Sequence, residues 1–425
     1  MSLFYLPTTA VRHDSNSQAL RYDVVAPTSA LPNAGKGGGS VTFQVDTPAN
    51  NWFVPSMSYF DFRIKVIETR VESSTDVNSA VDITDGSGAD EAQFSEYPAS
   101  HLVTNYSHSI AGVTLENISD CPELSAVQSR TMLNREVLDT LGASFRMADV
   151  LTNANSGTTM PGAGTSLQPW DGSVTTFSCG YQPPGSLFQY PGALPGLKQR
   201  IVISLDSSIK KCVLFASTTL GAAYTVEIDA INFYAAHVIS RDVMPIPEQV
   251  VLSLPMMGCT KQHHAGSTGT HSFSVPASTD RVYVFKNVAD QTSVVGTAAH
   301  EFQTDITNLE MSYAGQRSPA LAYSDMGGTS ATRDIMRPFW DFAQSTGHLL
   351  NGRGLQDNQA TWADRPIFAG IFDKSAGDNS TTLTVRSSAG AEGNIGVCHV
   401  SHKVAVLSYD EAGLATGLVV QENLM

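Results

Sequence analysis

The alternation of side chains over residues 224–255 constrains the fold more than any other stretch of the sequence. Apolar residues occupy even positions at first and odd positions from Ile231 onward. Period-two alternation is typical of a strand with one buried face, and a one-residue change of phase predicts a β-bulge near Ala230. Pro245 and Pro247 then interrupt pairing, because proline has no N–H to donate, and a new strand begins directly afterwards. The stretch therefore predicts a junction between two sheet domains.

Chain length and composition agree with this division. At 425 residues the chain exceeds what one hydrophobic core usually serves, so two domains of about 200 residues each are expected. Charged residues make up only 15%, while 34 glycines and 20 prolines indicate many turns. These proportions are typical of an all-β globular protein.

Both halves of the sequence show the same order of elements: short strands, a long loop, one helix, and further strands that end in a long one. In the first half we expect strands at 40–45, 59–66, 108–115, 200–205 and 212–215, and a helix at 122–148 with Asp120 as its cap. In the second half we expect strands at 249–254, 271–275, 280–287, 305–313, 367–372, 381–386 and 396–409, and a helix at 333–350 with Phe339, Trp340, Phe342 and Ala343 as its apolar set. Two long polar loops are expected at 69–100 and 152–196. We divide the chain into an arm at 1–39 that ends in a flexible glycine-rich stretch, a first domain at 40–240, a linker at 241–247, a second domain at 248–412 and a tail at 413–425.

The charge of the chain argues against nucleic-acid binding. The net charge is −15, and the densest basic cluster is the pair Lys210 and Lys211. A protein that packs nucleic acid through its own arm needs a basic run to neutralise phosphates. We therefore expect no direct nucleic-acid binding.

Two further features indicate a protein made inside a cell. We find no signal peptide at the N-terminus and no apolar run of membrane-spanning length. The five cysteines are scattered, odd in number and without CxxC spacing, which favours reduced thiols.

No motif points to catalysis or to a bound cofactor. The sequence lacks a complete P-loop, a dinucleotide-binding GxGxxG, a GxSxG elbow and an HExxH pair. The best metal candidate is Cys398 with His402 on one strand, joined by Cys259, His263 or His264. Zinc needs three or four converging ligands, and the spacing aligns only two, so we favour a buried thiol and ordinary histidines. We therefore predict no enzyme, and no catalytic, cofactor-binding or metal-binding residues.

Three aromatic residues in the second long loop allow another interpretation. Trp170, Tyr181 and Tyr190 could form a surface that stacks on sugars. Aromatic residues more often anchor a long loop to the core, and we favour that role.

The order of elements resembles that of a known family. Residues 41–45 and 59–66 resemble its opening strand pair, and residues 107–116 resemble the strand that precedes its first helix. Residues 223–255 resemble the junction between its two domains, and residues 337–411 its closing segment. The chain thus resembles the double jelly-roll major capsid proteins of tailless icosahedral DNA viruses, the lineage of adenovirus hexons, virophages and polinton-like viruses.

The resemblance implies a fold and a function. The fold is two tandem eight-stranded antiparallel jelly rolls with long loops and one short helix per half. The function is that of a structural major capsid protein. Three copies form a homotrimer, which is a pseudo-hexameric capsomer, and many such capsomers tile an icosahedral virion shell. The implied partners are other copies of the chain, neighbouring trimers, and penton and minor capsid proteins. The long loops would lie on the outer surface or between subunits, and in this lineage an internal membrane or other proteins commonly lie between shell and genome.

Two other classes of function remain open from the sequence. One is a viral coat or spike protein with a single jelly roll, which a matching pair of halves would exclude. The other is a cellular β-sandwich module that binds carbohydrate or protein and uses a groove lined by Trp170 or Tyr181.

Overall fold

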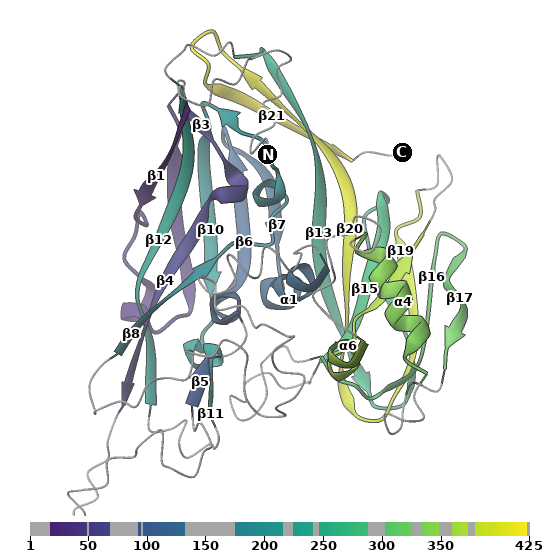
Figure 1. Ribbon diagram of the computed structural model, residues 1–425. Helices are drawn as coiled ribbons and strands as arrows, with labels where there is room; N and C mark the ends of the chain where they lie inside the picture. Colours follow the sequence, from purple (N-terminus) through teal and green to yellow (C-terminus); the bar gives the residue numbers. More distant parts are fainter. Residues whose placement is uncertain are drawn as a thin grey trace, which may run out of the picture.

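The computed structural model describes most of the chain, and the described part consists mainly of antiparallel strands (Figure 1). The described residues are 18–48, 51–68, 92–94, 97–131, 175–215, 224–240, 246–287, 302–324, 326, 334–347, 359–372 and 379–422. The first half contains β1 (Gln18–Val25), β2 (Gly39–Asp46), β3 (Asn51–Phe53), β4 (Tyr59–Glu68), β5 (Ala92–Phe94), β6 (Val103–Ile110), β7 (Val113–Ile118), α1 (Cys121–Thr131), β8 (Thr175–Tyr181), β9 (Leu194–Pro195), β10 (Lys198–Leu205), β11 (Val213–Phe215) and β12 (Tyr224–Ser240). The second half contains β13 (Gln249–Ala265), β14 (Thr268–Ser274), β15 (Thr279–Asn287), β16 (Ile306–Tyr313), β17 (Gln316–Tyr323), α4 (Met336–Ser345), α6 (Gln359–Asp364), β18 (Phe368–Ile371), β19 (Thr382–Ala389), β20 (Glu392–Tyr409) and β21 (Ala415–Glu422). Among these described elements no helix has the length and apolar character needed to cross a membrane.

The two halves are sandwiches with the same strand order. In the second half one sheet runs β13-β20-β15-β18 and the other β14-β19-β16-β17. Counted along the chain, these are strands one-eight-three-six and two-seven-four-five. In the first half the main strands β1, β2, β4, β6, β7, β8, β10 and β12 form sheets β1-β12-β4-β8 and β2-β10-β6-β7, which is the same order. This confirms the expectation of two eight-stranded antiparallel sandwiches.

The bulge predicted in the last long strand of the first half is present in β12. Ile228 pairs with Ile64 of β4, and Ala230 pairs with the adjacent Arg63, which leaves Asp229 as the extra residue. The bulge keeps Ile231, like Ile228, on the core side of the sheet.

The strand expected at 108–115 is a hairpin instead. Residues Ala111 and Gly112 form the turn between β6 and β7, with φ values of 50° and 80°. Positive φ at both central residues is the geometry of a tight two-residue hairpin, which reverses the chain. The expectation was wrong because the apolar pattern continues across the turn.

The arm and the tail both contain strands that the sequence analysis did not expect. Residues 18–25 form β1, which pairs along its whole length with β12 and is the first strand of the first sandwich. Residues 415–422 belong to β21, which pairs with β20. The strands at 41–45 and 59–66, expected as the opening pair, are the second and third strands of the first roll, because β1 takes the first position. The glycine-rich end of the arm is packed too: Gly38 N–H donates to Asp206 O at 3.0 Å.

The expected loop at 152–196 was partly wrong. Residues 175–181 form β8, which pairs with β4, and Leu187 and Leu194 are buried. The alternation of Phe177, Cys179 and Tyr181 with small polar residues is a strand signal that the many nearby glycines and prolines masked. Of the expected loop at 69–100, the segment 98–100 is also buried, whereas residues 69–91 and 152–174 lie outside the described residues.

The described helices differ from those expected from the sequence. The structure describes α1 to Thr131, and the rest of the predicted helix to residue 148 lies outside the described residues. In the second half α4 ends at Ser345, and α6 follows it as an additional helix. Trp340, expected in the apolar set of α4, is 47% exposed, whereas Phe342 and Ala343 are buried.

A continuous hydrophobic core extends through both halves. In the first half Phe60 lies between Phe43 and Phe233, with ring centroids 5.1 and 4.7 Å away. The cluster of buried apolar residues continues without interruption into the second half, where it includes Leu383 and Val385. The halves are therefore packed against each other and are not separate beads on a linker.

Candidate functional site

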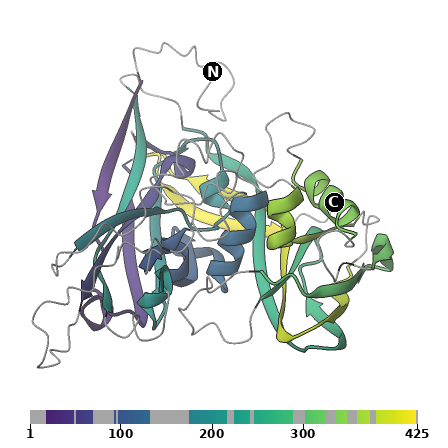
Figure 2. The same cartoon turned by 60° about the horizontal axis from the view of Figure 1, so that its bottom comes forward.

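Helix α1 lies between the two sandwiches in both views of the ribbon (Figure 1, Figure 2). It begins after Asp120, whose carbonyl accepts a hydrogen bond from Leu124 N–H at 3.1 Å. Its apolar residues Cys121, Leu124 and Val127 are fully buried in the core. The helix thus has one side anchored in the core and the other free to contact the second half.

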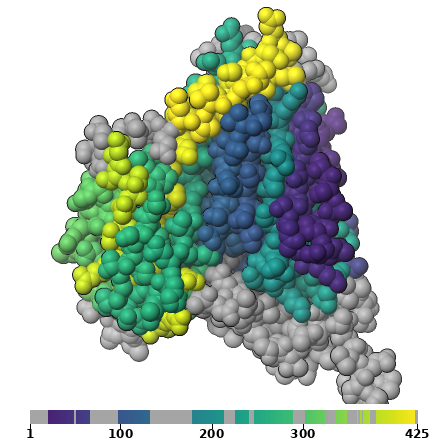
Figure 3. All heavy atoms as spheres, turned by 180° about the vertical axis from the view of Figure 1, so that it is seen from behind, coloured from purple at the N-terminus to yellow at the C-terminus, as the bar shows by residue number. Residues whose placement is uncertain are grey.

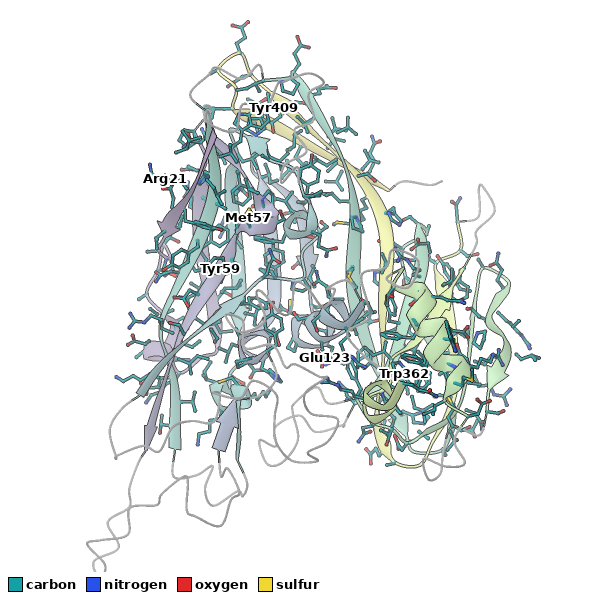
Figure 4. All side chains as sticks on the ribbon, in the orientation of Figure 1. Arg21, Met57, Tyr59, Glu123, Trp362 and Tyr409 are labelled. Atoms are coloured by element: carbon teal, nitrogen blue, oxygen red, sulfur yellow. The ribbon has the colours of Figure 1, made fainter. Side chains whose placement is uncertain are left out.

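An ion pair between a buried carboxylate and a partly buried lysine joins α1 to the second half. Glu123 is 1% exposed, and its Oε1 accepts hydrogen bonds from Lys261 Nζ of β13 at 2.7 Å and from Asn287 Nδ2 of β15 at 3.3 Å. The carboxylate of Asp120, expected as a helix cap, pairs with the same Nζ at 3.1 Å. Burial lowers the pKa of Lys261, but Glu123 and Asp120 outweigh burial, and the pKa ends above its usual value. Figure 4 places Glu123 at the boundary between the halves.

Two further contacts fix the halves together. Arg130 NH1 of α1 donates to Arg365 O at 2.6 Å, and its guanidinium lies 6.0 Å from the ring centroid of Phe302. At the other end of the boundary, Ala415 N–H of β21 donates to Gly196 O at 2.8 Å. A Cβ at Gly196 would overlap the carbonyl oxygen of Gly413, so the two segments approach as closely as backbone atoms allow. The relative placement of the sandwiches is therefore set by specific contacts at several points.

The candidate metal ligands are only partly brought together. Cys259 and Cys398 lie directly opposite each other on β13 and β20, and burial raises the pKa of both thiols. His402 Nε2 lies 3.3 Å from Asp280 Oδ2, His263 Nε2 lies 3.6 Å from Glu392 Oε1, and His264 Nδ1 contacts His271 Nε2 at 3.0 Å. Within the described part of the chain no group of three or more His, Cys, Asp or Glu converges as a metal site.

The candidate sugar-stacking surface is not formed by Tyr181. This residue is fully buried, and its ring packs against Phe62 and Tyr97 at centroid distances of 6.0 and 5.7 Å. Tyr190 is partly buried against the core, and Trp170 lies outside the described residues. Tyr181 thus has the anchoring role that the sequence analysis favoured.

Glu116 of β7 is a buried carboxyl that the sequence analysis did not single out. Its Oε2 accepts hydrogen bonds from Ser186 N–H and Ser186 Oγ, both at 2.9 Å. Burial nevertheless raises its pKa from 4.5 to about 7. The proton is therefore bound more tightly in the folded chain than in the unfolded one.

The replacement Glu116→Gln is expected to change the pH dependence of stability. The contribution of Glu116 is fully present below pH 4.5 and is lost as the pH rises through about 7, a difference of about 3 kcal/mol. The free energy of unfolding of the variant should therefore increase relative to that of the parent protein as the pH rises from 4.5 to 8. Chemical denaturation at several pH values measures this difference, with the exposed Glu411→Gln as control. Parallel curves for parent and Glu116→Gln would contradict the expectation.

The contact between Glu123 and Lys261 was not predicted from the sequence, since the two residues are 138 positions apart. The only local signal was an acidic residue in the first turn of a predicted helix, which is common at exposed helix ends.

Comparison with known proteins identifies the architecture. No protein-family model and no curated protein sequence matches the chain. Among solved structures, a chain of the Sputnik virophage, determined by cryo-EM, has a TM-score of 0.69 at 13% identity and covers 100% of this chain and 92% of its own length. The mavirus major capsid protein has a TM-score of 0.56 at 11% identity, with 100% and 94% covered. The Faustovirus major capsid protein has a TM-score of 0.53 at 7% identity, with 96% and 92% covered.

The fold is a double jelly roll. The likeness extends over nearly the full length of each compared chain, so it includes both rolls and the boundary between them. At sequence identities of 7–13% this likeness shows the architecture alone, so the role of each residue follows from its own contacts.

Proposed function

We propose that this double jelly-roll protein is a structural, non-enzymatic major capsid protein. Three copies would form a trimer whose six rolls make a pseudo-hexameric capsomer, and capsomers would tile the icosahedral shell of a virion assembled inside the host cell. The proposal includes the division of the chain into two rolls with a linker at 241–247. Penton proteins, minor capsid proteins and an internal membrane are proposed neighbours of the shell.

One observation carries the proposal: two sandwiches of identical strand order are fixed side by side in one chain. Buried contacts, among them the 2.7 Å pair of Lys261 and Glu123, hold them at one relative orientation. A rigid unit with two similar ends can present six similar sandwiches from three copies, which is the geometry of a hexagonal tile. The full-length likeness to the mavirus and Faustovirus major capsid proteins supports the same role.

The alternatives fit less well. A single-jelly-roll coat protein has no place for the second set of eight strands. A carbohydrate-binding groove lined by Tyr181 would need an exposed ring, and this ring is buried.

The purified protein is expected to be a trimer. Size-exclusion chromatography with light scattering should give a mass near three times 45.3 kDa. Negative-stain electron microscopy should show particles with a nearly hexagonal outline. A stable monomer at micromolar concentration would contradict the proposal.

The same protein is expected not to bind duplex DNA at physiological salt. Its net charge of −15 repels phosphate, and counterion release on binding needs a basic surface. Fluorescence anisotropy with labelled DNA measures this, and tight binding that weakens with added salt would be the opposing result.

A further inference from the structure

The contact between the two rolls of one chain indicates how rolls of neighbouring chains could pack. On the sheet β13-β20-β15-β18, the face opposite the core of the second roll includes Met257, Cys259, Cys398 and Val400, all of them buried. Helix α1 of the first roll contacts β13 on this side, where Glu123 meets Lys261. One roll thus uses the helix that follows its fifth strand to cover the outer sheet face of the other roll.

Part of the equivalent sheet face of the first roll carries exposed apolar and tyrosine side chains. On β1-β12-β4-β8 the side chains opposite the core include Leu20, Tyr22 and Val24, which are 41%, 41% and 59% exposed. Tyr59 stacks on Tyr234 at a centroid distance of 5.1 Å, and Tyr22 meets Tyr59 edge-on at 6.2 Å. We call these five residues the tyrosine face. Figure 4 shows Tyr59 on this outer side of the first roll.

The equivalent helix of the second roll also carries exposed apolar side chains. Helix α4 follows the fifth strand of its roll, as α1 does, and buries Phe342 inward. On its outer side Met336 and Trp340, one helical turn apart, are 62% and 47% exposed. Leu321 of the neighbouring β17 is 73% exposed, and its carbonyl accepts a hydrogen bond from Arg337 NH2 at 2.6 Å. We call Leu321, Met336 and Trp340 the helix face.

The two faces lie at opposite ends of the molecule, so one chain cannot bring them together. In Figure 1 β1 is at one end and α4 with β17 at the other, and Figure 3 shows the same separation from behind. Contiguous apolar surface is seldom left exposed on a soluble monomer, and tyrosine and tryptophan are favoured anchors of protein interfaces.

We propose that the helix face of one copy packs on the tyrosine face of the next copy. This inference rests on the proposed capsid function and specifies its subunit contact. Within the chain, helix α1 of the first roll packs on the outer sheet face of the second roll. Between chains, helix α4 of the second roll would pack on the outer sheet face of the first roll of the next copy, so each roll contacts the next in the same way. Because the two faces differ, the interface is heterologous. In a trimer, three contacts within chains alternate with three contacts between chains, and these six similar contacts close a ring of six rolls.

Charge substitution on either face tests the proposal. Val24→Asp and Trp340→Asp each place a carboxylate in an apolar contact that occurs three times in the trimer. Each should raise the protein concentration at half-dissociation by at least about 100-fold, measured by sedimentation. The matched control is Val419→Asp on β21, a strand valine that is 53% exposed and belongs to neither face. It should remain a trimer.

Cross-linking tests the pairing of the faces and does not depend on how the charged variants fold. The five native cysteines form no disulfide and are all buried, so an introduced surface cysteine is the main target of a short bis-maleimide. The double variant with Val24→Cys and Leu321→Cys should give covalent dimers and trimers, whereas each single variant should remain monomeric on a denaturing gel. Cross-linking of Val24→Cys alone would show that two tyrosine faces meet, which overturns the heterologous contact.

The outcomes separate this inference from the proposed function. If the parent protein is a trimer and both charged variants, folded by circular dichroism, stay trimeric, the contact is wrong and the capsid function stands. If the parent protein is a stable monomer that gives no cross-links, the proposed function fails together with the contact.

Discussion

Replacing Lys261 with methionine is expected to destabilise the folded chain by about 3 kcal/mol. The substitution leaves Glu123, which is 1% exposed, as a buried carboxylate without the opposing charge of Lys261, while the hydrogen bond from Asn287 Nδ2 remains. Removal of one partner from a buried ion pair typically costs 3–5 kcal/mol, because the other charge stays in a medium of low polarity. Urea denaturation at a fixed protomer concentration measures the loss.

A double-mutant cycle separates the pair from its surroundings. Glu123→Gln removes the charge, so the double variant Lys261→Met with Glu123→Gln should recover much of the stability lost in Lys261→Met. Lys36→Met is the matched control, because Lys36 is exposed and lies 3.8 Å from Glu227. An exposed pair contributes about 0–1 kcal/mol, so the control should unfold close to the parent protein. Equal losses in Lys261→Met and Lys36→Met would show that the contact between the halves carries no special weight.

Replacing Trp362 with alanine is expected to have the second large effect. Trp362 of α6 is 1% exposed and packs against Phe339, Phe342 and Phe368, with centroids between 5.6 and 6.4 Å away. Its Nε1 donates to Ile367 O at 3.0 Å. Truncation of a buried tryptophan typically costs 3–5 kcal/mol, through lost burial and the cavity that remains. Figure 4 shows Trp362 beside α4, so the loss should also loosen the helix that carries the helix face.

The control for this prediction is Trp362→Phe, which keeps an aromatic ring and loses the hydrogen bond. It should cost about 1–2 kcal/mol, clearly less than the alanine substitution. Thermal unfolding followed by near-ultraviolet circular dichroism distinguishes the two variants. A Trp362→Ala protein that melts with the parent would show that the cluster between α4, α6 and β18 contributes little.

The strands that the sequence predicted correctly are those whose inward face is apolar throughout. In β4 Phe60, Phe62 and Ile64 alternate with polar residues, and in β12 the change of phase marks the bulge at Asp229. One strand that was missed, β1, is of another kind. In β1 the apolar residues Leu20, Tyr22 and Val24 point away from the core, so an apolar alternation there did not mark a buried face.

The candidate site was less accessible to sequence reasoning than the fold. Glu123 and Lys261 look like ordinary surface residues, because nothing within a few positions shows that they meet. The alternation in β8 was present, but the surrounding glycines and prolines favoured a loop over Phe177 and Tyr181. The candidate metal ligands failed for the same reason as the ion pair: spacing along one strand does not tell what approaches its face.

The sequence by itself determined many of the strands, where the long strand of the first half ends, and that the two halves follow one pattern. Periodicity is a property of neighbouring residues, so it survives without knowledge of the rest of the chain. Only the tertiary structure decided that β1 and β21 complete the sheets, that Glu123 reaches Lys261, and that two apolar faces remain at opposite ends. The pairing of β1 with β12 and the contact of Glu123 with Lys261 join residues more than a hundred positions apart, and their energy comes from contacts that exist only once the chain has folded.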